Sequence, residues 1–207
     1  MNPKKLTLLV VLLVAADQAL KLWVKTHMLI GDPAITIFPD WFQLRFVENP
    51  GMAFGMRLQM GGGYDWGKLL LGLFRIALAA GIGCYLFRAA RDGKTAKSLL
   101  IGLAMILAGA IGNLLDSAFY GLIFSESTPL TVASFGGHYA GFMMGRVVDM
   151  LYFPLFQWNG VPDALRFLVD HEHYFFGPIF NLADAYISVA VVWLLLQQLF
   201  QRKTEKK

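Results

Sequence analysis

Two aspartates, Asp149 and Asp184, stand in stretches of the sequence where a carboxyl group can do chemistry. Asp149 lies in the run GRVVDMLYFP, and Asp184 lies in the first turns of the apolar segment GPIFNLADAYISVAVVWLLLQQLF. An ionisable group at the edge of a membrane is expected to have a function, because burying a lone charge in lipid is unfavourable. Two carboxyl groups that lie close together cannot both ionise, so one donates a proton while the other activates water. The pair therefore suggests peptide-bond hydrolysis by general acid–base catalysis, without a covalent intermediate.

Other residues that commonly carry catalysis are less well placed. The histidines all fall in predicted loops: His27, His138, His171 and His173. Glu172 lies between two of them and could complete a metal site, but a solvated loop explains this grouping better. Ser117 has no nearby histidine or lysine in the sequence, and the single cysteine, Cys84, has no partner for a disulfide or a thiolate metal site. The residues alone leave three classes open: an aspartic peptidase, a transporter with an acidic proton relay, and a structural scaffold. The peptidase interpretation requires neither a metal nor an organic cofactor.

The composition is that of an integral membrane protein. Of the 207 residues, 57% are hydrophobic and only 15% are charged, whereas soluble domains carry about 25% charged residues. Apolar runs predict four transmembrane helices, at about 6–24, 69–87, 99–119 and 179–200. A run of this length spans ~28 Å at ~1.5 Å per residue, close to the thickness of the hydrocarbon core. We therefore expect an all-α membrane protein in which residues 1–207 form a single domain.

The distribution of charge predicts the orientation in the membrane. Basic residues precede the first apolar run, separate the second from the third, and follow the last, whereas most acidic residues lie in the loops at about 28–67 and 121–178. By the positive-inside rule, both termini are cytoplasmic and these two loops are extracytoplasmic. The net charge of +4 is explained by this pattern and does not call for nucleic acid as a partner.

The sequence of the first outer loop predicts a small sheet at the membrane surface. The runs ITIF and FQLRFV are typical of short strands, and PDW between them is typical of a turn. Asn49-Pro50-Gly51 predicts a second, sharp turn, and Gly61-Gly62-Gly63 a flexible tip. The second outer loop, which includes GRVVDM, is assigned no strand, only a possible interfacial helix at ALRFLVD.

Polar residues of three spans gather in the outer half of the membrane. Asp17 lies ~16 Å and Asn113 ~21 Å from the cytoplasmic edge at ~1.5 Å per residue, and Asn181 and Asp184 lie ~22–27 Å from it. They are expected to face one another or a watery cleft. The cytoplasmic half of the spans contains no acidic residue, which speaks against a transporter, because a proton path would cross the whole bilayer.

Several of these polar residues also have a purely structural interpretation. Asp17 and Lys21 are four residues apart on one helical face and can form an ion pair that only supports the fold. Asp116 could orient the outer end of the third span, and Asn49 could be only a turn residue. Arg75, near the outer end of the second span, could extend to the membrane interface.

Five motifs, in order, resemble the lipoprotein signal peptidase (signal peptidase II) family: DQALK, ENPGMAFG, GNLLDS, GRVVDM and FNLADAYI. The resemblance covers most of the chain and implies that Asp149 and Asp184 are catalytic. It carries supporting roles, which order the site and hold the substrate, to Asp17, Lys21, Asn49, Gly109, Asn113 and Asn181. Asp116, in GNLLDS, and Arg146, next to VVD, are further candidates for support.

The resemblance also implies a substrate and a location. It implies cleavage of signal peptides from diacylglyceryl-modified prolipoproteins, just before the lipidated cysteine, at the outer edge of the bacterial inner membrane. It further implies an extracytoplasmic β-cradle, contact with membrane lipids, and inhibition by globomycin-type compounds. We expect a monomer that needs no cofactor. A catalytically inactive homologue that binds lipoproteins remains an alternative.

The chain departs from the family pattern in two places. Ser117 stands where the family usually has arginine after GNxxD, and our hypothesis is that Arg146 or Arg75 supplies the positive charge instead. The intervals on both sides of Asp149 are also long. Residues 121–145 and 152–178 are therefore expected to form additional extracytoplasmic structure, as a lid or a partner surface.

Overall fold

Four long apolar helices dominate the computed structural model, which describes residues 1–39, 41–50, 66–169 and 173–204. Each of the four is long and apolar enough to cross a membrane, as the sequence predicted. The helices are α1 (Pro3–His27), α2 (Trp66–Asp92), α3 (Lys97–Leu115), which continues through a π-helical turn (Asp116–Tyr120) into α4 (Gly121–Ile123), and α5 (Leu182–Thr204). α1, α2 and the continuous helix from α3 to α4 extend beyond the predicted spans at both ends, whereas α5 begins three residues after the predicted start and ends four residues after the predicted end.

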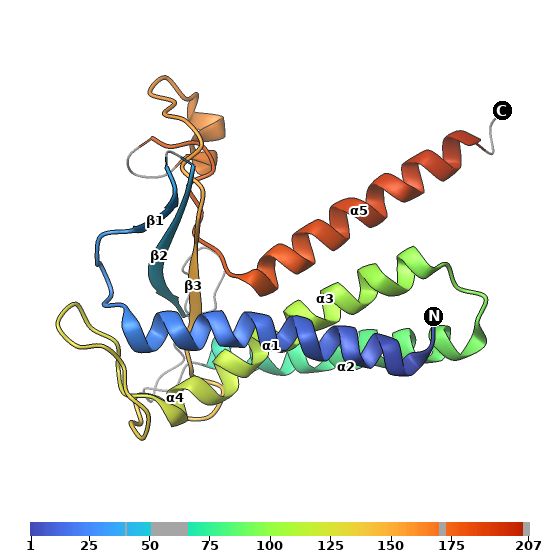
Figure 1. Cartoon of the computed structure of the whole chain (residues 1–207), viewed down its shortest axis with the longest axis horizontal. Coiled ribbons are helices and arrows are strands. Elements are labelled where there is room, and N and C mark those ends of the chain that lie inside the picture. Colours follow the sequence, from blue (N-terminus) through green and yellow to red (C-terminus); the bar gives the residue numbers. More distant parts are fainter. Residues whose placement is uncertain (40, 51–65, 170–172, 205–207) are drawn as a thin grey trace.

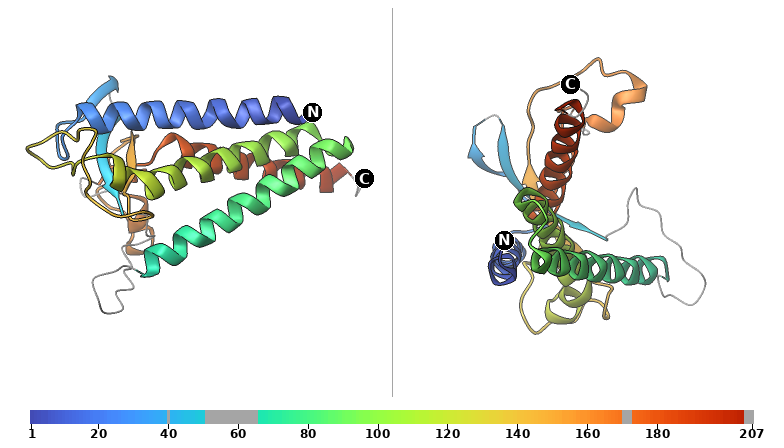
Figure 2. Two further views of the ribbon diagram at one scale, coloured as in Figure 1. Left: turned by 90° about the horizontal axis from the view of Figure 1, so that it is seen from below. Right: turned by 90° about the vertical axis from the view of Figure 1, so that its right-hand side faces the viewer.

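The helices run between two ends of the molecule that differ in structure (Figure 1). The N-terminus, the connection between α2 and α3, and the end of α5 lie at one end of the molecule, and the sheet lies at the other. The two further views agree with this arrangement and show α2 and α5 diverging from the other helices (Figure 2). Both termini therefore lie on the same side, as four predicted spans require.

A three-stranded antiparallel sheet joins the helix ends, in the order β1 (Ile35–Phe38), β2 (Phe42–Asn49) and β3 (Val147–Tyr152). The hairpin of β1 and β2 confirms the predicted strands. The assignment of GRVVDM to a loop was wrong, because VVDMLY forms β3, with Val47 opposite Asp149 and Asn49 opposite Val147. All six residues of β3 are buried, so the strand lacks the alternation by which a half-exposed strand is recognised.

Two other predictions concern the outer loops. The predicted interfacial helix at ALRFLVD corresponds to a short 3-10 helix (Asp163–Leu168). The predicted glycine tip at Gly61–Gly63 lies outside the described residues.

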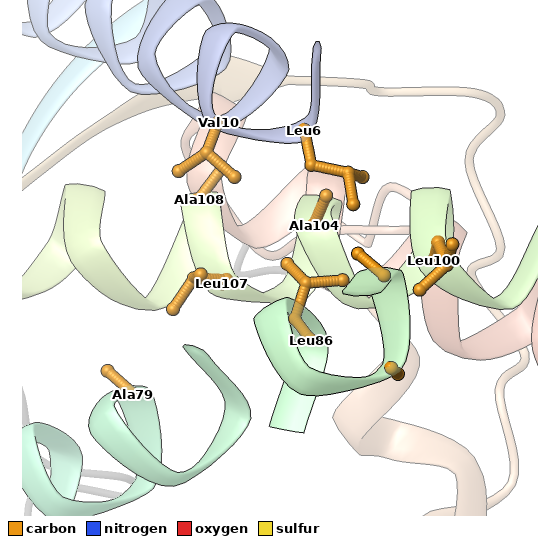
Figure 3. Packing of buried hydrophobic residues seen from close by; sticks show 10 residues of the cluster. Leu6, Val10, Ala79, Leu86, Leu100, Ala104, Leu107 and Ala108 are labelled. Atoms are coloured by element: carbon orange, nitrogen blue, oxygen red, sulfur yellow. The ribbon is translucent and has the colours of Figure 1, made fainter. Parts of the chain in front are cut away.

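The apolar core of the helices lies among α1, α2 and α3 (Figure 3). Leu6 and Val10 of α1 and Leu86 of α2 pack against Ala104 and Ala108 of α3. Small residues on α3 let its neighbours approach closely. The core thus fixes α1 and α2 on one side of α3 and leaves another side of α3 for α5.

α5 packs closely against two glycines of α3. A Cβ atom at Gly109 would collide with the backbone oxygen of Ala183 and lie 2.7 Å from Cγ1 of Ile187, and one at Gly112 would lie 3.1 Å from Cβ of Ala183. This close packing brings the first turn of α5, which carries Asp184, next to Asn113 of α3.

A second apolar cluster fixes the sheet to the helix ends. Val24 and Met28 of α1 pack with Phe46 of β2 and with Val148 and Met150 of β3. The sheet is therefore attached to the same helices that carry the polar residues predicted to form the site.

Candidate active site

One amide side chain connects the two aspartates. Asn181 Nδ2 donates a hydrogen bond of 2.6 Å to Asp149 Oδ1, and Asn181 Oδ1 accepts one of 3.0 Å from the backbone N–H of Asp184. The second bond is the usual N-cap interaction at the start of a helix, here α5. Asn181 is completely buried and Asp149 is 3% exposed. Asn181 therefore joins the start of α5 to the middle of β3, next to the backbone hydrogen bonds between Leu151 and Phe180.

Burial perturbs the acidity of Asp149. Burial, and secondarily the charge of Asp184, raise the pKa of Asp149 from 3.8 to about 7. Hydrogen bonds from Asn181 and Asn49 oppose this rise in pKa, because they stabilise the carboxylate. Asp149 therefore exchanges its proton near neutral pH, as a general acid or base requires.

Asn113 orients the other aspartate. Its Nδ2 donates a hydrogen bond of 2.7 Å to Asp184 Oδ1, and its Oδ1 accepts one of 2.9 Å from Lys21 Nζ. Because the ammonium group can only donate, it binds the oxygen end of the amide and leaves the nitrogen end for Asp184.

Lys21 is the centre of a buried polar group that we call the Lys21 network, formed by Asp17, Gln18, Lys21, Asn113 and Asp116. Lys21 Nζ lies 3.0 Å from Asp17 Oδ2 and 2.8 Å from Asp116 Oδ2. Asp17 Oδ1 also accepts a hydrogen bond of 2.9 Å from the backbone of Ala183. The predicted ion pair of Asp17 and Lys21 is present, and the network joins α1, α3 and the start of α5.

Sequence reasoning missed Gln18 as a member of this network. Gln18 Nε2 donates to Asp116 Oδ1 at 2.9 Å and to the backbone oxygen of Gly112 at 3.1 Å, and its oxygen accepts from the Tyr120 hydroxyl at 3.2 Å. Its position beside Asp17 within an apolar helix was the available signal. In the described part of the chain, no buried side-chain nitrogen or oxygen is left without a partner.

The two candidate arginines differ in position. The guanidinium of Arg146 bonds Glu48 and Glu126, and in the described part of the chain it contacts neither Asp149 nor Asp184. Arg75 lies on the face of α2 that includes the buried residues Gly72 and Ala79, and the charge of Asp184 acts on it.

The positions of Arg75 and Ser117 bear on interpretations made from the sequence. Arg75 is half-buried and lies within the range of the charge of Asp184, which favours a role at the site over an extension to the membrane interface. Ser117, in the position where the family usually has arginine, donates a hydrogen bond of 3.0 Å to the backbone oxygen of Asn113.

Among the described residues, no group of three or more histidine, cysteine, aspartate and glutamate side chains could hold a metal ion, and His171 and Glu172 lie outside them.

Lys25 and Glu48 were also missed. They form a buried ion pair just beyond the Lys21 network, at the outer end of α1. Lys25 follows Lys21 by four residues, so it lies on the same face of α1. This spacing was the available signal.

Several known proteins have a similar sequence or fold. The family model described as signal peptidase (SPase) II matches residues 9–200. A lipoprotein signal peptidase of Porphyromonas gingivalis is 45% identical over 197 residues, which cover 93% of this chain and 82% of that protein. Another, of Amoebophilus asiaticus, is 37% identical over 191 residues, covering 90% and 74% of the two chains.

Two solved structures, both described as bacterial membrane enzymes, have the same fold. They superpose with TM-scores of 0.62 and 0.60, at 20% and 21% sequence identity. They cover 99% and 95% of this chain, and the matched regions make up 93% and 94% of theirs. The family match over nearly the whole chain, together with the close relatives, establishes that this chain belongs to the signal peptidase II family.

Proposed function

We propose that this chain is an aspartic endopeptidase that removes signal peptides from diacylglyceryl-modified prolipoproteins, just before the lipidated cysteine. Membership of the family supports a peptidase, and relatives named lipoprotein signal peptidase support lipoprotein precursors as its substrates. The observation that carries the aspartic mechanism is the bridge made by Asn181, which binds Asp149 and the backbone of Asp184 with one amide.

The surroundings of the two carboxyl groups suggest their roles. Asp184 accepts a hydrogen bond from Asn113, and its charge interacts with that of Arg75. Asp149 is buried, and its pKa of about 7 leaves it partly protonated at neutral pH. In this proposal Asp184 is the general base and Asp149 is the general acid.

The reaction then needs only one water molecule. Asp184 takes a proton from water as the water oxygen attacks the carbonyl carbon of the scissile bond, and Asp149 gives its proton to the carbonyl oxygen. When the tetrahedral intermediate collapses, the C–N bond breaks, the leaving nitrogen takes the proton held by Asp184, and Asp149 recovers its own. Positioning of both groups by neighbouring amides supplies part of the rate enhancement, because the reacting atoms are held in place beforehand.

The position of the pair suggests its location in the cell. β3, which carries Asp149, and the first turn of α5, which carries Asp184, lie at the end of the helices opposite both termini (Figure 1). With the termini in the cytoplasm, as the positive-inside rule predicts, the pair and the sheet lie at the extracytoplasmic edge of the bacterial inner membrane. A substrate held there by its own signal helix and acyl chains stays in the membrane while water reaches the carboxyl groups. A globomycin-type inhibitor is expected to occupy the same place, and the chain is expected to act as a monomer.

Arg75 is the better candidate for the positive charge that Ser117 cannot supply. It is half-buried on α2 and its charge interacts with that of Asp184, whereas Arg146 is bound to two glutamates. Arg75→Gln is therefore expected to slow cleavage.

The test compares cleavage of a diacylglyceryl-modified prolipoprotein by purified protein in detergent. Asp149→Asn and Asp184→Asn nearly preserve side-chain size but cannot share a proton, so each is expected to lose at least about 10²-fold in kcat. Asp163→Asn removes a carboxylate that is 99% exposed and serves as the matched control. If either folded variant cleaves at close to the wild-type rate, that aspartate is not catalytic, and Asp116 is the next candidate.

A further inference from the structure

A second buried group of charges lies beside the candidate active site and has no part in the mechanism above. Lys25 Nζ binds Glu48, and the hydroxyl of Ser127 accepts from Lys25 at 3.0 Å and donates to Glu48 Oε1 at 2.9 Å. Arg146 Nη1 binds the other oxygen of Glu48 at 3.1 Å. We call these four residues the Glu48 cluster.

The ion pair of Lys25 and Glu48 is enclosed by protein, whereas the side chain of Arg146 is 35% exposed. Lys25 is completely buried, and Glu48 is 3% exposed. The ammonium group of Lys25 lies 5.0 Å from the centre of the Tyr139 ring and 5.4 Å from that of Phe124. A buried ion pair of this kind is not in itself evidence for stability, because desolvation offsets the attraction between the charges. Because stability does not account for this ion pair, we consider where it lies relative to the two aspartates.

The cluster contacts the part of β2 and β3 that lies next to Asp149. Glu48 is opposite Val148, and Asn49 is opposite Val147, so the bond from Arg146 to Glu48 crosses between β2 and β3 next to Asn49. Asn49 in turn donates a hydrogen bond to the carboxylate of Asp149. Glu48 is thus held by three donors, one residue away from a direct partner of Asp149.

One face of α1 serves both aspartates. Asp17, Lys21 and Lys25 follow one another at four-residue intervals, and each is at most 1% exposed. Lys21 holds Asn113, which binds Asp184. Lys25 holds Glu48, whose neighbour Asn49 binds Asp149.

We infer that the Glu48 cluster is a second positioning network of the proposed reaction. It holds Asn49 on Asp149 from the sheet side, as the Lys21 network holds Asn113 on Asp184 from the helix side. The inference rests on the proposed function, and it gives residues 121–145 a part in the reaction. This additional segment supplies Ser127 to the cluster and Tyr139 to its wall, so it braces the sheet.

The test measures kcat and KM for cleavage of a diacylglyceryl-modified prolipoprotein in detergent. Glu48→Gln keeps the shape of the side chain but removes its charge, and it is expected to lower kcat by up to about 10²-fold with little change in KM, because the catalytic geometry and not substrate binding is disturbed. Asp163→Asn, on the exposed 3-10 helix, removes one negative charge elsewhere and is the control.

A double variant separates positioning from general damage to the fold. If Glu48 acts through Asn49, adding Glu48→Gln to Asn49→Ala lowers kcat no further than Asn49→Ala alone. A loss in the double variant that equals the product of the two single losses would overturn the inference.

A further variant covers the case in which Glu48→Gln does not fold. Lys25→Met combined with Glu48→Gln removes both buried charges together and leaves neither of the pair uncompensated. If this folded protein, or folded Glu48→Gln, keeps the wild-type kcat, the inference is wrong while the proposed function stands. If the wild-type protein cleaves no lipid-modified prolipoprotein, the proposed function itself is wrong.

Discussion

Replacement of Asp149 by asparagine should stabilise the protein, and the gain should depend on pH. In the folded protein the pKa of Asp149 is raised from 3.8 to about 7, chiefly by burial. Between these two values the folded state binds a proton that the unfolded state has lost, so wild-type stability falls as the pH rises from about 4 to about 7. The rise in pKa corresponds to roughly 4 kcal/mol of unfolding free energy.

The Asp149→Asn variant would not carry this penalty, because an amide does not ionise. Its side-chain oxygen can still accept the hydrogen bond from Asn181 Nδ2, which lies 2.6 Å from Asp149 Oδ1 in the wild type. The variant should therefore gain stability relative to the wild type, by up to roughly 4 kcal/mol, as the pH rises from about 4 to about 8. For a chain of this size the gain corresponds to roughly 10 °C in the unfolding midpoint.

The assay is thermal unfolding of both proteins in the same detergent at a series of pH values. Asp163→Asn, at a side chain that is 99% exposed, should differ from the wild type by a constant amount at every pH. A difference between Asp149→Asn and the wild type that is also constant with pH would refute the reasoning, because Asp149 would then not be a carboxyl group kept neutral by burial.

Two further predictions concern the supports of the site. Lys21→Met leaves Asp17 and Asp116 buried without their cation, so the unfolding free energy should fall by about 3–5 kcal/mol; an unchanged unfolding midpoint in detergent would contradict the role given to the Lys21 network. Gly109→Ala places a Cβ against the backbone of Ala183, so α5 must move and cleavage should slow by about 10²-fold. Gly83→Ala, whose Cβ would lie 3.7 Å from Leu107, is the matched control, and equal rates for the two variants would contradict the argument from close packing.

The parts of the structure that follow from local patterns could be predicted. Four apolar runs predicted the four long helices, and ITIF and FQLRFV predicted the hairpin of β1 and β2. Asp17 and Lys21 are neighbours on one helix, so their ion pair follows from spacing alone.

The parts that depend on distant contacts could not be predicted in the same way. β3 is apolar along most of its length and pairs with β2, about a hundred positions earlier in the sequence. The bond from Arg146 to Glu48 likewise joins residues 98 positions apart, so the sequence does not show which carboxylates this arginine faces. The π-helical turn at Asp116–Tyr120 carries no pattern that separates it from the α-helix before it.

The charged face of α1 has a consequence for biosynthesis. α1 leaves the ribosome first, yet Lys21 meets Asn113 only 92 residues later, and Asp17 meets the backbone of Ala183 only 166 residues later. Each such charge in the middle of a lone helix opposes membrane insertion by about 2.5–3.5 kcal/mol. The nascent first helix therefore enters lipid less readily than its apolar residues alone would, and the Lys21 network is complete only when α3 and α5 have been made. Lys21 can pair with Asp17 within α1 itself, whereas Lys25 needs Glu48, which follows 23 residues later in the first outer loop.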